Sequence, residues 1–428
     1  MIVFSKKLKI TECCPKHFLT MHSVVSQTEI KMININETNK KHCCGCTACE
    51  SVCHKKCISM QTDNEGFKYP VVDKTKCVNC RLCEKVCPIL NKTHNVFPNT
   101  AYVVRNKNSE IVRSSTSGGA VTAFSKEIIN NGGIVFGGAF DGNFYVKHTY
   151  AETESELSKF RSSKYVQSDM GTTFTEVKQQ LDNRKFVMFT GTPCQVEGLQ
   201  NYLRKPYDNL FTIDFVCRAV PSPLVWEKYR EFMEKKFGSE ITYANFREKT
   251  YGYHSANLTL RFANGKKSIE NTNTDYMLKS FFKGICSRPS CYDCKFREPG
   301  RVSDLTVFDC WNITRYVNGL ADDDKGYTAV IIQSTKGAKL FEKAKHNLIV
   351  YPADPKLLLE NDGHMAMENP KYHKNRKEYF EMLNNGYNIE QVVKKYIPIK
   401  ISRKIFGKFR GFFYKTGILR FLKKLKIK

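Results

Sequence analysis

Two runs of cysteine decide the fold: Cys43-Cys-Gly-Cys-Thr-Ala-Cys-Glu-Ser-Val-Cys53 and Cys77-Val-Asn-Cys-Arg-Leu-Cys-Glu-Lys-Val-Cys87-Pro88. Each run spaces four thiols as x2-x2-x3, the pattern that holds cubane iron–sulfur clusters. Three thiolates two residues apart wrap around one corner of a cluster, and the fourth thiolate serves the partner cluster. The runs therefore predict two [4Fe-4S] clusters, one on Cys43, Cys46, Cys49 and Cys87, the other on Cys53, Cys77, Cys80 and Cys83.

The segment between the runs predicts a β-hairpin. Residues 58–61 and 67–72 have the composition of strands, and Asp63-Asn64-Glu65-Gly66 forms the turn between them. We therefore expect residues 34–92 to form a small two-cluster ferredoxin-type domain. A pair of structural zinc sites is the alternative, because C-x2-C pairs also occur in zinc knuckles. Two matched runs of four cysteines favour clusters.

Length and cysteine usage bound the remaining possibilities. The chain has 428 residues, which leaves room for a catalytic body beyond the cluster domain, and most of its 18 cysteines fall in ligand spacings. That usage predicts a reducing, cytoplasmic environment. No signal peptide or apolar run of roughly 20 residues is visible. Residues 1–33 differ in character from the rest and precede a second start candidate, Met32, so we expect a disordered segment or a start-site artefact.

The formal net charge of +26 is concentrated at the C-terminus. Residues 400–428 contain eleven Lys or Arg and no acidic residue, which leaves about +15 on the body. Apolar residues alternate with these lysines, which predicts a basic amphipathic helix on an anionic membrane surface at the inner face, or on an acidic partner. A flexible basic tail is the alternative, since Gly407, Gly411 and Gly417 weaken a helix. Nucleic acid is disfavoured because no recognition motif accompanies the charge. The apolar positions are Ile405, Phe409, Phe412, Phe413, Ile418, Leu422 and Leu425.

From residue 100 onward, apolar runs of strand length alternate with helical periodicity, which predicts a mixed α/β domain over residues 100–350. Residues 351–428 are predicted to form a helical extension that ends in the basic tail. The fold class is thus α+β or α/β, with the small cluster domain first. The predicted strands cover residues 100–105, 134–140, 145–149, 186–189, 210–216, 241–246, 257–262, 303–308 and 327–333.

Three stretches of this body carry chemical signals. Ser114-Ser115-Thr116-Ser117-Gly118-Gly119 precedes a helix, and hydroxyls and glycines at a helix start suit a phosphate or pyrophosphate. The alternative is an ordinary Ser-capped helix. Lys164 and Gln167 follow in a loop and are further candidates for cofactor contact. Thr190-Gly191-Thr192-Pro193-Cys194-Gln195 links a strand to a helix, the arrangement found where open α/β sheets bind ligands.

Five cysteines of the body are candidate ligands or nucleophiles. Cys194 stands at a helix N-terminus, where the dipole favours a thiolate nucleophile or metal ligand, although a buried inert thiol is the competing interpretation. Cys217 ends the next strand, so it lies on the same rim of the sheet. Cys286-x4-Cys291-x2-Cys294 supplies three ligands of a third [4Fe-4S] cluster, which Cys217 or Cys194 would complete. A zinc site and free thiols are the alternatives.

These motifs, in this order, resemble the beta subunit of coenzyme F420 (8-hydroxy-5-deazaflavin) hydrogenase/dehydrogenase. The likeness rests on Ser114 to Gly119, Lys164 to Ser168, Thr190 to Gln195, Val216 to Pro223 and Cys286 to Lys295, and covers about residues 32–351. Bacterial members carry an N-terminal two-cluster ferredoxin. The resemblance implies a body that binds FAD and one [4Fe-4S] cluster and moves a hydride or two electrons between a deazaflavin-type substrate and iron–sulfur carriers.

The resemblance also implies site residues. Ser115, Ser117, Gly118 and Gly119 would face the FAD phosphates. The turn of Thr190, Gly191, Thr192, Pro193 and Gln195 would lie near the isoalloxazine ring, with Lys164, Tyr165 and Gln167 as further contacts. The chain departs from the family at Arg218, where a histidine is usual, and at Phe308, where a glycine is usual. These departures leave proton delivery and the substrate side open.

The leading hypothesis is an iron–sulfur flavoprotein oxidoreductase that links ferredoxin-type clusters to FAD and exchanges hydride with a small organic substrate. Arg218 and Lys164 are candidates for stabilising anionic flavin or substrate, and Cys194 is the candidate nucleophile. A redox protein or subunit is the expected partner. The rival is a non-enzymatic electron carrier or redox-responsive partner protein, in which Arg218 and Phe308 mark lost catalysis.

Overall fold

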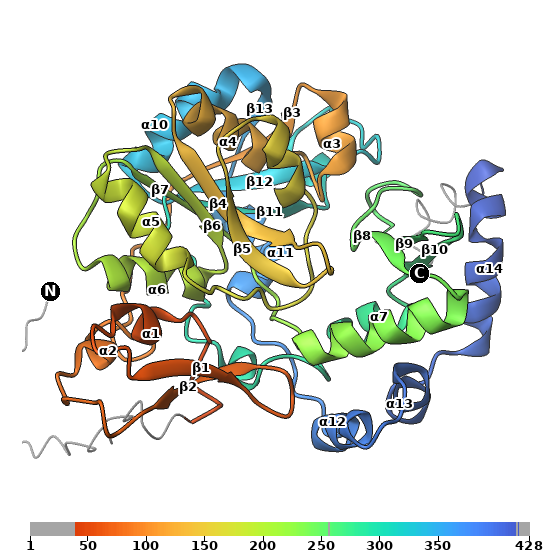
Figure 1. Ribbon diagram of the computed structural model, residues 1–428. Helices are drawn as coiled ribbons and strands as arrows, with labels where there is room; N and C mark the ends of the chain where they lie inside the picture. Colours follow the sequence, from red (N-terminus) through yellow and green to blue (C-terminus); the bar gives the residue numbers. More distant parts are fainter. Residues whose placement is uncertain (1–38, 256, 417, 419–428) are drawn as a thin grey trace, which may run out of the picture. The chain divides into compact units, whose positions relative to one another are not determined.

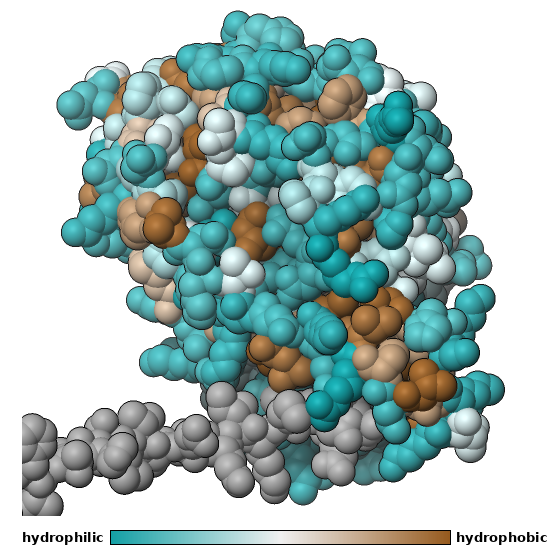
Figure 2. All heavy atoms as spheres, turned by 90° about the vertical axis from the view of Figure 1, so that its left-hand side faces the viewer, coloured by the Kyte–Doolittle hydropathy of each residue, from teal (hydrophilic) through white to brown (hydrophobic). Residues whose placement is uncertain are grey.

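The computed structural model describes residues 39–255, 257–416 and 418 (Figure 1). The predicted segment 1–33, Met32 and the tail positions Leu422 and Leu425 lie outside these residues. The described residues belong to one compact unit. None of their helices is long and apolar enough to cross a bilayer. Figure 2 shows one face of the molecule, on which hydrophilic residues predominate and apolar residues form separate patches.

The cluster region consists of two short helices around a hairpin. β1 (Ile58–Thr62) pairs antiparallel with β2 (Lys68–Val72), as predicted. The turn closes because Asp63 Oδ1 accepts hydrogen bonds from the backbone N–H groups of Glu65 and Phe67, both at 3.0 Å. α1 (Ala48–Val52) and α2 (Leu82–Lys85) lie inside the two cysteine runs.

The two cysteine runs share one backbone course. Each run passes through two left-handed residues, Gly45 (φ 73°) and Thr47 (φ 68°) in the first and Asn79 (φ 52°) and Arg81 (φ 59°) in the second. These residues occupy the same positions relative to the first cysteine of each run, so the backbone has the same turns around both groups of thiols. The repeated spacing therefore produces a pseudo-symmetric pair of half-sites.

The body is built on an eight-stranded mixed sheet. Neighbouring pairs among β4, β6, β7 and β11 are parallel, and the remaining pairs are antiparallel. Since β3 and β11 are both antiparallel to β12, they run in the same direction. The carboxyl ends of β3, β4, β6, β7 and β11 therefore share one edge of the sheet. The order is β13 (Leu348–Ala353), β3 (Thr100–Asn106), β12 (Tyr327–Ile332), β11 (Leu305–Cys310), β7 (Leu210–Phe215), β6 (Val187–Gly191), β4 (Ile134–Phe140) and β5 (Val146–Ala151).

Helices cover both faces of this sheet (Figure 1). α4 (Ala120–Asn130) and α10 (Thr335–Ala344) pack on one face, where Val135 and Met188 are buried. α5 (Thr173–Asp182) and α6 (Pro193–Leu203) pack on the other, against the alternate residues Phe136 and Phe189. α11 (Pro355–Asn361) covers the β3–β12 part of that second face. Strands buried on both faces explain the continuous apolar runs in the sequence.

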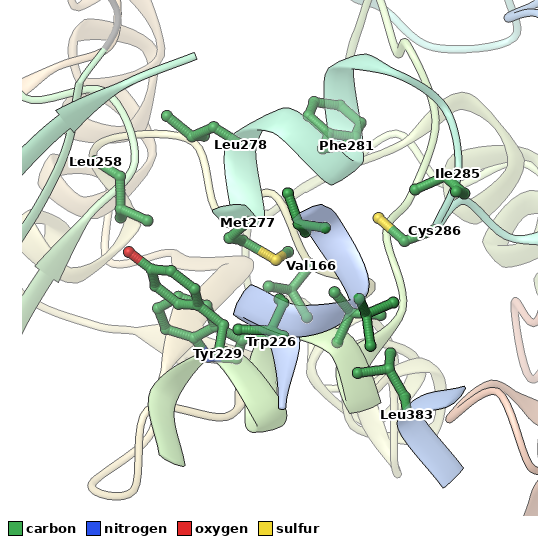
Figure 3. Close-up of a cluster of buried hydrophobic side chains, with 14 of the residues drawn as sticks. Val166, Trp226, Tyr229, Leu258, Met277, Leu278, Phe281, Ile285, Cys286 and Leu383 are labelled. Atoms are coloured by element: carbon green, nitrogen blue, oxygen red, sulfur yellow. The ribbon is translucent and has the colours of Figure 1, made fainter. Parts of the chain in front are cut away.

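A second core gathers the remaining elements around α7 (Pro223–Phe237), as Figure 3 shows in part. α7 begins after Ser222, whose Oγ accepts from the Val225 backbone N–H at 3.3 Å, and Pro223 occupies its first position. The elements that pack around α7 are the sheet β10 (Lys267–Asn271), β9 (Asn257–Phe262) and β8 (Ile241–Asn245), with α8 (Tyr276–Phe282), α12 (Arg376–Asn384) and α13 (Ile389–Tyr396).

The predicted order of a ferredoxin region followed by a mixed α/β body is confirmed. Two strands were missed: β10, which is polar, and β13, which extends the main sheet where the helical extension was expected to begin. The helical prediction for the C-terminal part holds in α11, α12, α13 and α14 (Ile401–Lys415). The short elements are α3 (Ser109–Ser114), α9 (Ile313–Tyr316) and the 3-10 turns Ser155–Phe160, Pro289–Asp293, Lys345–Asn347 and His364–Ala366.

Candidate iron–sulfur and cofactor site

The first group of thiols contains Cys43, Cys46 and Cys49 from the first run and Cys87 from the second. Burial, followed by the neighbouring thiols of Cys43 and Cys87, raises the pKa of Cys49 well above its usual value. Cys87 likewise lies close enough to Cys43 for the two thiols to interact. The fold thus brings the fourth cysteine of one run to the first three of the other. We call Cys43, Cys46, Cys49 and Cys87 the inner group.

The second group, Cys53, Cys77, Cys80 and Cys83, is the outer group. Cys80 is exposed and the other three are half-buried. Cys83 lies near Cys80, and the additional thiol Cys57 lies 3.3 Å from Cys53 and near Cys77. Each group therefore offers four thiols, which is the donor set that a [4Fe-4S] cluster requires.

The inner group packs directly on the body through α6. A Cβ atom added at Gly198 would lie 2.9 Å from both Cβ and Sγ of Cys46, so only glycine permits this approach. The segment after the second run is also fixed to α6, because Glu197 accepts a hydrogen bond from the Thr93 backbone N–H at 2.6 Å and pairs with Lys92 at 3.3 Å. Cys46 is buried as a result.

A third group of thiols lines a hollow of about 700 Å³, part of it open to solvent. Cys194 comes from the turn between β6 and α6, Cys217 from the end of β7, and Cys291 and Cys294 from the segment after α8. Burial, then the thiols of Cys291, Cys194 and Cys294, raise the pKa of Cys217 well above its usual value. We call Cys194, Cys217, Cys291 and Cys294 the rim group. They converge at the shared carboxyl edge of the sheet.

The structure does not bring Cys286 to the rim group. Its side chain is completely buried in the core around α7, between Ile285 and the other apolar side chains that Figure 3 shows. Cys194 and Cys217 both line the hollow, where the sequence predicted one or the other. The rim group therefore contains four thiols without Cys286. Among the described residues, no set of three His, Cys, Asp or Glu side chains converges closely enough to hold one metal ion.

The thiol of Cys44 lies between the inner and rim groups. It interacts with the thiols of both Cys46 and Cys194, and it lines the hollow of the rim group. No role was predicted for Cys44 from the sequence, because its position breaks the x2 spacing. Only the folded structure indicates a role for Cys44, through its contact with Cys194 of α6.

Cys194 differs from the expected low-pKa nucleophile. Its interaction with Cys44 and its burial raise its pKa well above the usual value, so the helix dipole is outweighed. Thr192 Oγ1 lies 3.1 Å from the thiol, and Thr192 and Gln195 cap α6 reciprocally. In the absence of a bound metal, these surroundings disfavour an activated nucleophile at Cys194.

The loop Ser114 to Gly119 packs on the opposite end of the sheet edge, against β3 and β12. A Cβ at Gly118 would meet the Val104 carbonyl at 2.5 Å, and the Gly118 N–H donates to Thr328 Oγ1 at 2.9 Å. Ser117 Oγ also lies 2.8 Å from Thr328 Oγ1, and Ser115 is buried. α4 begins after Gly119 (φ 78°) without a side-chain cap, so the alternative of a Ser-capped helix is wrong.

Cations without carboxylate partners surround this loop. Lys249 Nζ donates to the Ser117 carbonyl at 2.5 Å, and burial lowers its pKa to about 7. Arg161 donates to Ser114 Oγ at 3.3 Å, while its buried Nε has no partner among the described residues. Lys164 donates to the Lys159 carbonyl at 2.7 Å, and burial lowers its pKa to about 7. This environment fits an anionic group such as a pyrophosphate.

The other predicted cofactor contacts are engaged within the protein. Gln195 Oε1 accepts from the Thr192 N–H at 2.9 Å, Thr190 Oγ1 donates to the Phe136 carbonyl at 3.1 Å, and Gly191 packs on the Phe189 ring. Gln167 donates to the Cys44 carbonyl at 3.1 Å. Thr192, Pro193, Gln195 and Gln167 line the hollow of the rim group. The structure therefore divides the predicted flavin contacts between the rim group and the Ser114–Gly119 loop.

Arg218 does not itself line the hollow, although its guanidinium lies 3.9 Å from the sulfur of Met365, which does. Its guanidinium donates to the Phe282 carbonyl at 2.9 Å and lies 5.6 Å from the centre of that ring. Burial, followed by the neighbouring Arg297, lowers its pKa. Phe308 also differs from the expectation of a substrate-side residue, because it is buried against Gly363 in the core under α11.

The sequence missed a buried ionic network at the end of β11. Arg247 pairs with Asp309 at 3.1 Å, donates to Tyr165 Oη at 3.0 Å, and lies 4.8 Å from the centre of the Trp311 ring. Tyr253 donates to Asp309 at 3.2 Å. The position of Asp309 directly after the predicted strand 303–308 was the available signal.

Two groups of four thiols in a ferredoxin-like region, docked on a mixed α/β body, define an iron–sulfur oxidoreductase. Residues 42–90 match the family model of the 4Fe-4S dicluster domain, and residues 184–356 match that of the C-terminal part of the coenzyme F420 hydrogenase/dehydrogenase beta subunit. The chain therefore combines a 4Fe-4S dicluster domain with a region similar to the C-terminal part of this oxidoreductase subunit, and the predicted resemblance is confirmed.

Comparison with curated proteins gave no significant match. Among solved structures, a chain of the F420-reducing [NiFe] hydrogenase complex from Methanosarcina barkeri, studied by xenon derivatization, is similar at 18% sequence identity and a TM-score of 0.42. The similarity covers 68% of this chain and 94% of that chain.

Proposed function

We propose that this protein passes electrons inward from the outer group through the inner group to the rim group and FAD, and exchanges hydride with an organic substrate. Iron–sulfur clusters supply one-electron transfer and FAD supplies the conversion between single electrons and hydride. The observation that carries the proposal is the succession of three groups of four thiols, with Cys44 touching the last two.

Each group of residues has a defined task in this proposal. The outer and inner groups would each hold one cluster, and Cys194, Cys217, Cys291 and Cys294 would hold the third. α6 excludes water from the inner group through the close packing of Gly198 on Cys46. The Ser114–Gly119 loop, with Arg161, would bind the FAD pyrophosphate, because it offers uncapped helix N–H groups and a guanidinium nitrogen without a partner among the described residues. Lys249, whose ammonium donates to three backbone carbonyls, would hold the loop in place. Lys164 would add positive charge nearby.

The outer group would receive electrons from a redox partner protein. Its surroundings support an acidic partner, since six basic residues near it are exposed and attract the opposite charge. These residues are Lys55, Lys56, Lys74, Lys76, Arg81 and Lys85.

Cofactor content after anaerobic purification tests the proposal, with Cys217→Ser and Cys286→Ser as a matched pair. We expect about twelve irons per chain and FAD in the unaltered protein, since each cubane holds four irons. Cys217→Ser should lose about four irons, whereas Cys286→Ser should keep them because its thiol lies in the core. Loss of the same iron in both variants, or in neither, would contradict the rim ligand set. Absence of FAD by mass analysis would end the flavin part.

A further inference from the structure

A single buried arginine joins the inner group to the body. Arg288 lies between Cys286 and Cys291 in sequence, and its side chain has no exposed surface. Its Nε donates to the Cys43 carbonyl at 2.7 Å, and its terminal nitrogens donate to the Lys68 carbonyl and to Gln167 Oε1, both at 2.9 Å. One of them also lies 3.6 Å from the Cys43 thiol. The guanidinium is therefore part of the surroundings of an inner ligand.

Arg288 has no carboxylate partner. No carboxylate oxygen of a described residue lies within 4.0 Å of its guanidinium. The guanidinium lies 4.2 Å from the centre of the Tyr69 ring and 5.4 Å from that of Phe67, and the Cys43 thiol at 3.6 Å is its nearest acidic group. An isolated buried cation is costly, so Arg288 requires a negative charge. Cluster-bound thiolates of the inner and rim groups are the available source.

In the part of the chain that the structure describes, no arginine takes the corresponding place beside the outer group. In the first run, Gly45 lets the guanidinium approach the backbone, since a Cβ there would lie 2.8 Å from an Arg288 nitrogen. The equivalent position of the second run is Asn79, whose Oδ1 lies 3.7 Å from the Cys77 thiol. The two runs are similar in sequence, but their surroundings differ because Arg288, which belongs to neither run, lies beside the first one only.

We propose that Arg288 is a positioning residue that acts as the counter-ion of the inner cluster and sets its reduction potential above that of the outer cluster. Reduction adds a negative charge to the cluster, and a buried cation that also donates toward a ligand sulfur stabilises that state. Electrons that enter at the outer group then move downhill toward the body. This inference rests on the proposed function, because it requires bound clusters.

Redox titration of the anaerobic full-length protein, followed by electron paramagnetic resonance, tests this role. Arg288→Met should shift one midpoint potential to more negative values, and Arg288→Lys should shift it less. Cys80→Ser removes the outer cluster and Cys217→Ser removes the rim cluster, so the signal that remains in both variants is the inner one. Arg376→Lys is the matched control, because Arg376 is a second buried arginine that binds the hairpin, but through the carboxylate of Glu65.

Two results separate this inference from the proposed function. Unchanged midpoints in Arg288→Met with full iron content would overturn the role of Arg288 alone. If Arg288→Met loses iron, Arg288→Lys decides, and unchanged midpoints there also overturn the inference. Absence of cluster signals in the unaltered protein would instead remove the proposed function.

A different observation concerns α14. One face of this helix packs on the three-stranded sheet, where Arg410 donates to Asn257 Oδ1 at 2.7 Å and a Cβ at Gly407 would lie 3.2 Å from Thr274. Tyr414 contacts the Tyr251 ring, with centres 5.5 Å apart. Gly407 and Gly411, two of the glycines expected to weaken the helix, thus lie on its packed face.

The opposite face of α14 presents an apolar stripe. Ile401, Ile405, Phe409 and Phe412 are 77%, 54%, 55% and 60% exposed, and their spacing places them along one side of the helix. Residues 400–415 include six Lys or Arg and no acidic residue. An exposed apolar stripe in a cationic helix suits a lipid surface, where anionic headgroups cover an apolar layer.

We infer that α14 docks this protein on a membrane surface of anionic lipid. The test is co-sedimentation of the full-length protein with phosphatidylcholine vesicles that contain or lack phosphatidylglycerol. The unaltered protein should bind only the anionic vesicles, and combined Ile405→Ser, Phe409→Ser and Phe412→Ser should abolish binding. Combined Val96→Ser and Tyr372→Ser, at exposed apolar positions elsewhere, should bind like the unaltered protein.

Several outcomes would contradict membrane docking. Equal binding of the stripe variant, or no binding of the unaltered protein to anionic vesicles, would overturn it. Concentration-dependent dimers that the stripe variant abolishes, without vesicle binding, would assign the stripe to a second copy of the chain. Iron content should remain unchanged in all variants, which verifies that they fold.

Discussion

The inner and outer groups of thiols come from nearly the same sequence pattern but lie in opposite surroundings. The inner group is packed on α6, with Cys46 buried and Arg288 beside Cys43. The outer group has an exposed cysteine, Cys80, among exposed basic residues. The cysteine spacing therefore specifies two similar half-sites, whereas the docked body gives them different surroundings. In the proposed function, the outer group takes up electrons and the inner group transfers them.

We expect the largest difference between the two groups when one cysteine of each is replaced. Cys46→Ser should lose the inner cluster and weaken docking on α6, because both depend on the buried Cys46. Cys80→Ser should lose the outer cluster and keep the docking. Iron analysis should show about four irons fewer in each variant, while the thermal midpoint should fall further in Cys46→Ser. Equal falls in the thermal midpoint would contradict the asymmetry.

The ion pair between Glu65 and Arg376 should give the next largest effect. It joins the ferredoxin hairpin to α12 through two hydrogen bonds of 2.5 Å, and Arg376 is only 4% exposed. Glu65→Gln should lower the free energy of unfolding by about 3 kcal/mol, because it leaves a buried cation unpaired. Urea unfolding measures this loss. Glu231→Gln, which removes an exposed pair with Lys228, is the control and should change stability by less than about 1 kcal/mol.

Gly198→Ala tests whether close packing on α6 defines the inner group. The added methyl would overlap Cys46, so we expect a loss of about 1–3 kcal/mol in the free energy of unfolding. Gly138→Ala is a suitable control, because a Cβ there meets no atom within 4 Å. An equal response of both variants in urea unfolding would show that α6 does not press on Cys46.

A separate effect concerns pH and the core that supports the Arg288 segment. Burial raises the pKa of Asp275 to about 7, while its unfolded value is near 4. The folded protein thus binds more protons than the unfolded protein between these values, so stability should fall as pH rises from about 4 to about 7 and then level off. Asp275→Asn should flatten this part of the profile. An unchanged slope in urea unfolding across that range would contradict the assignment.

The grouping of the thiols of the two cysteine runs, the hairpin and most strands could be predicted from the sequence, because these features depend on local spacing and periodicity. The sequence did not predict which thiols line the hollow, because a spacing such as Cys286-x4-Cys291 does not say where each side chain points. Cys286 follows Ile285 into the core at the end of α8, while Cys194 and Cys217 meet only after two strands pair. The contacts of Arg288 could not be predicted from the sequence either, because its partners Cys43 and Gln167 are distant in sequence.

The most direct test of the inward path is the rate at which a reduced acidic ferredoxin reduces the remaining clusters of Cys80→Ser. Stopped-flow absorbance should show slow reduction in this variant and rapid, salt-sensitive reduction in the unaltered protein. Cys286→Ser should behave like the unaltered protein. Equally rapid reduction of Cys80→Ser, with its outer cluster shown to be absent, would contradict electron uptake through the exposed group.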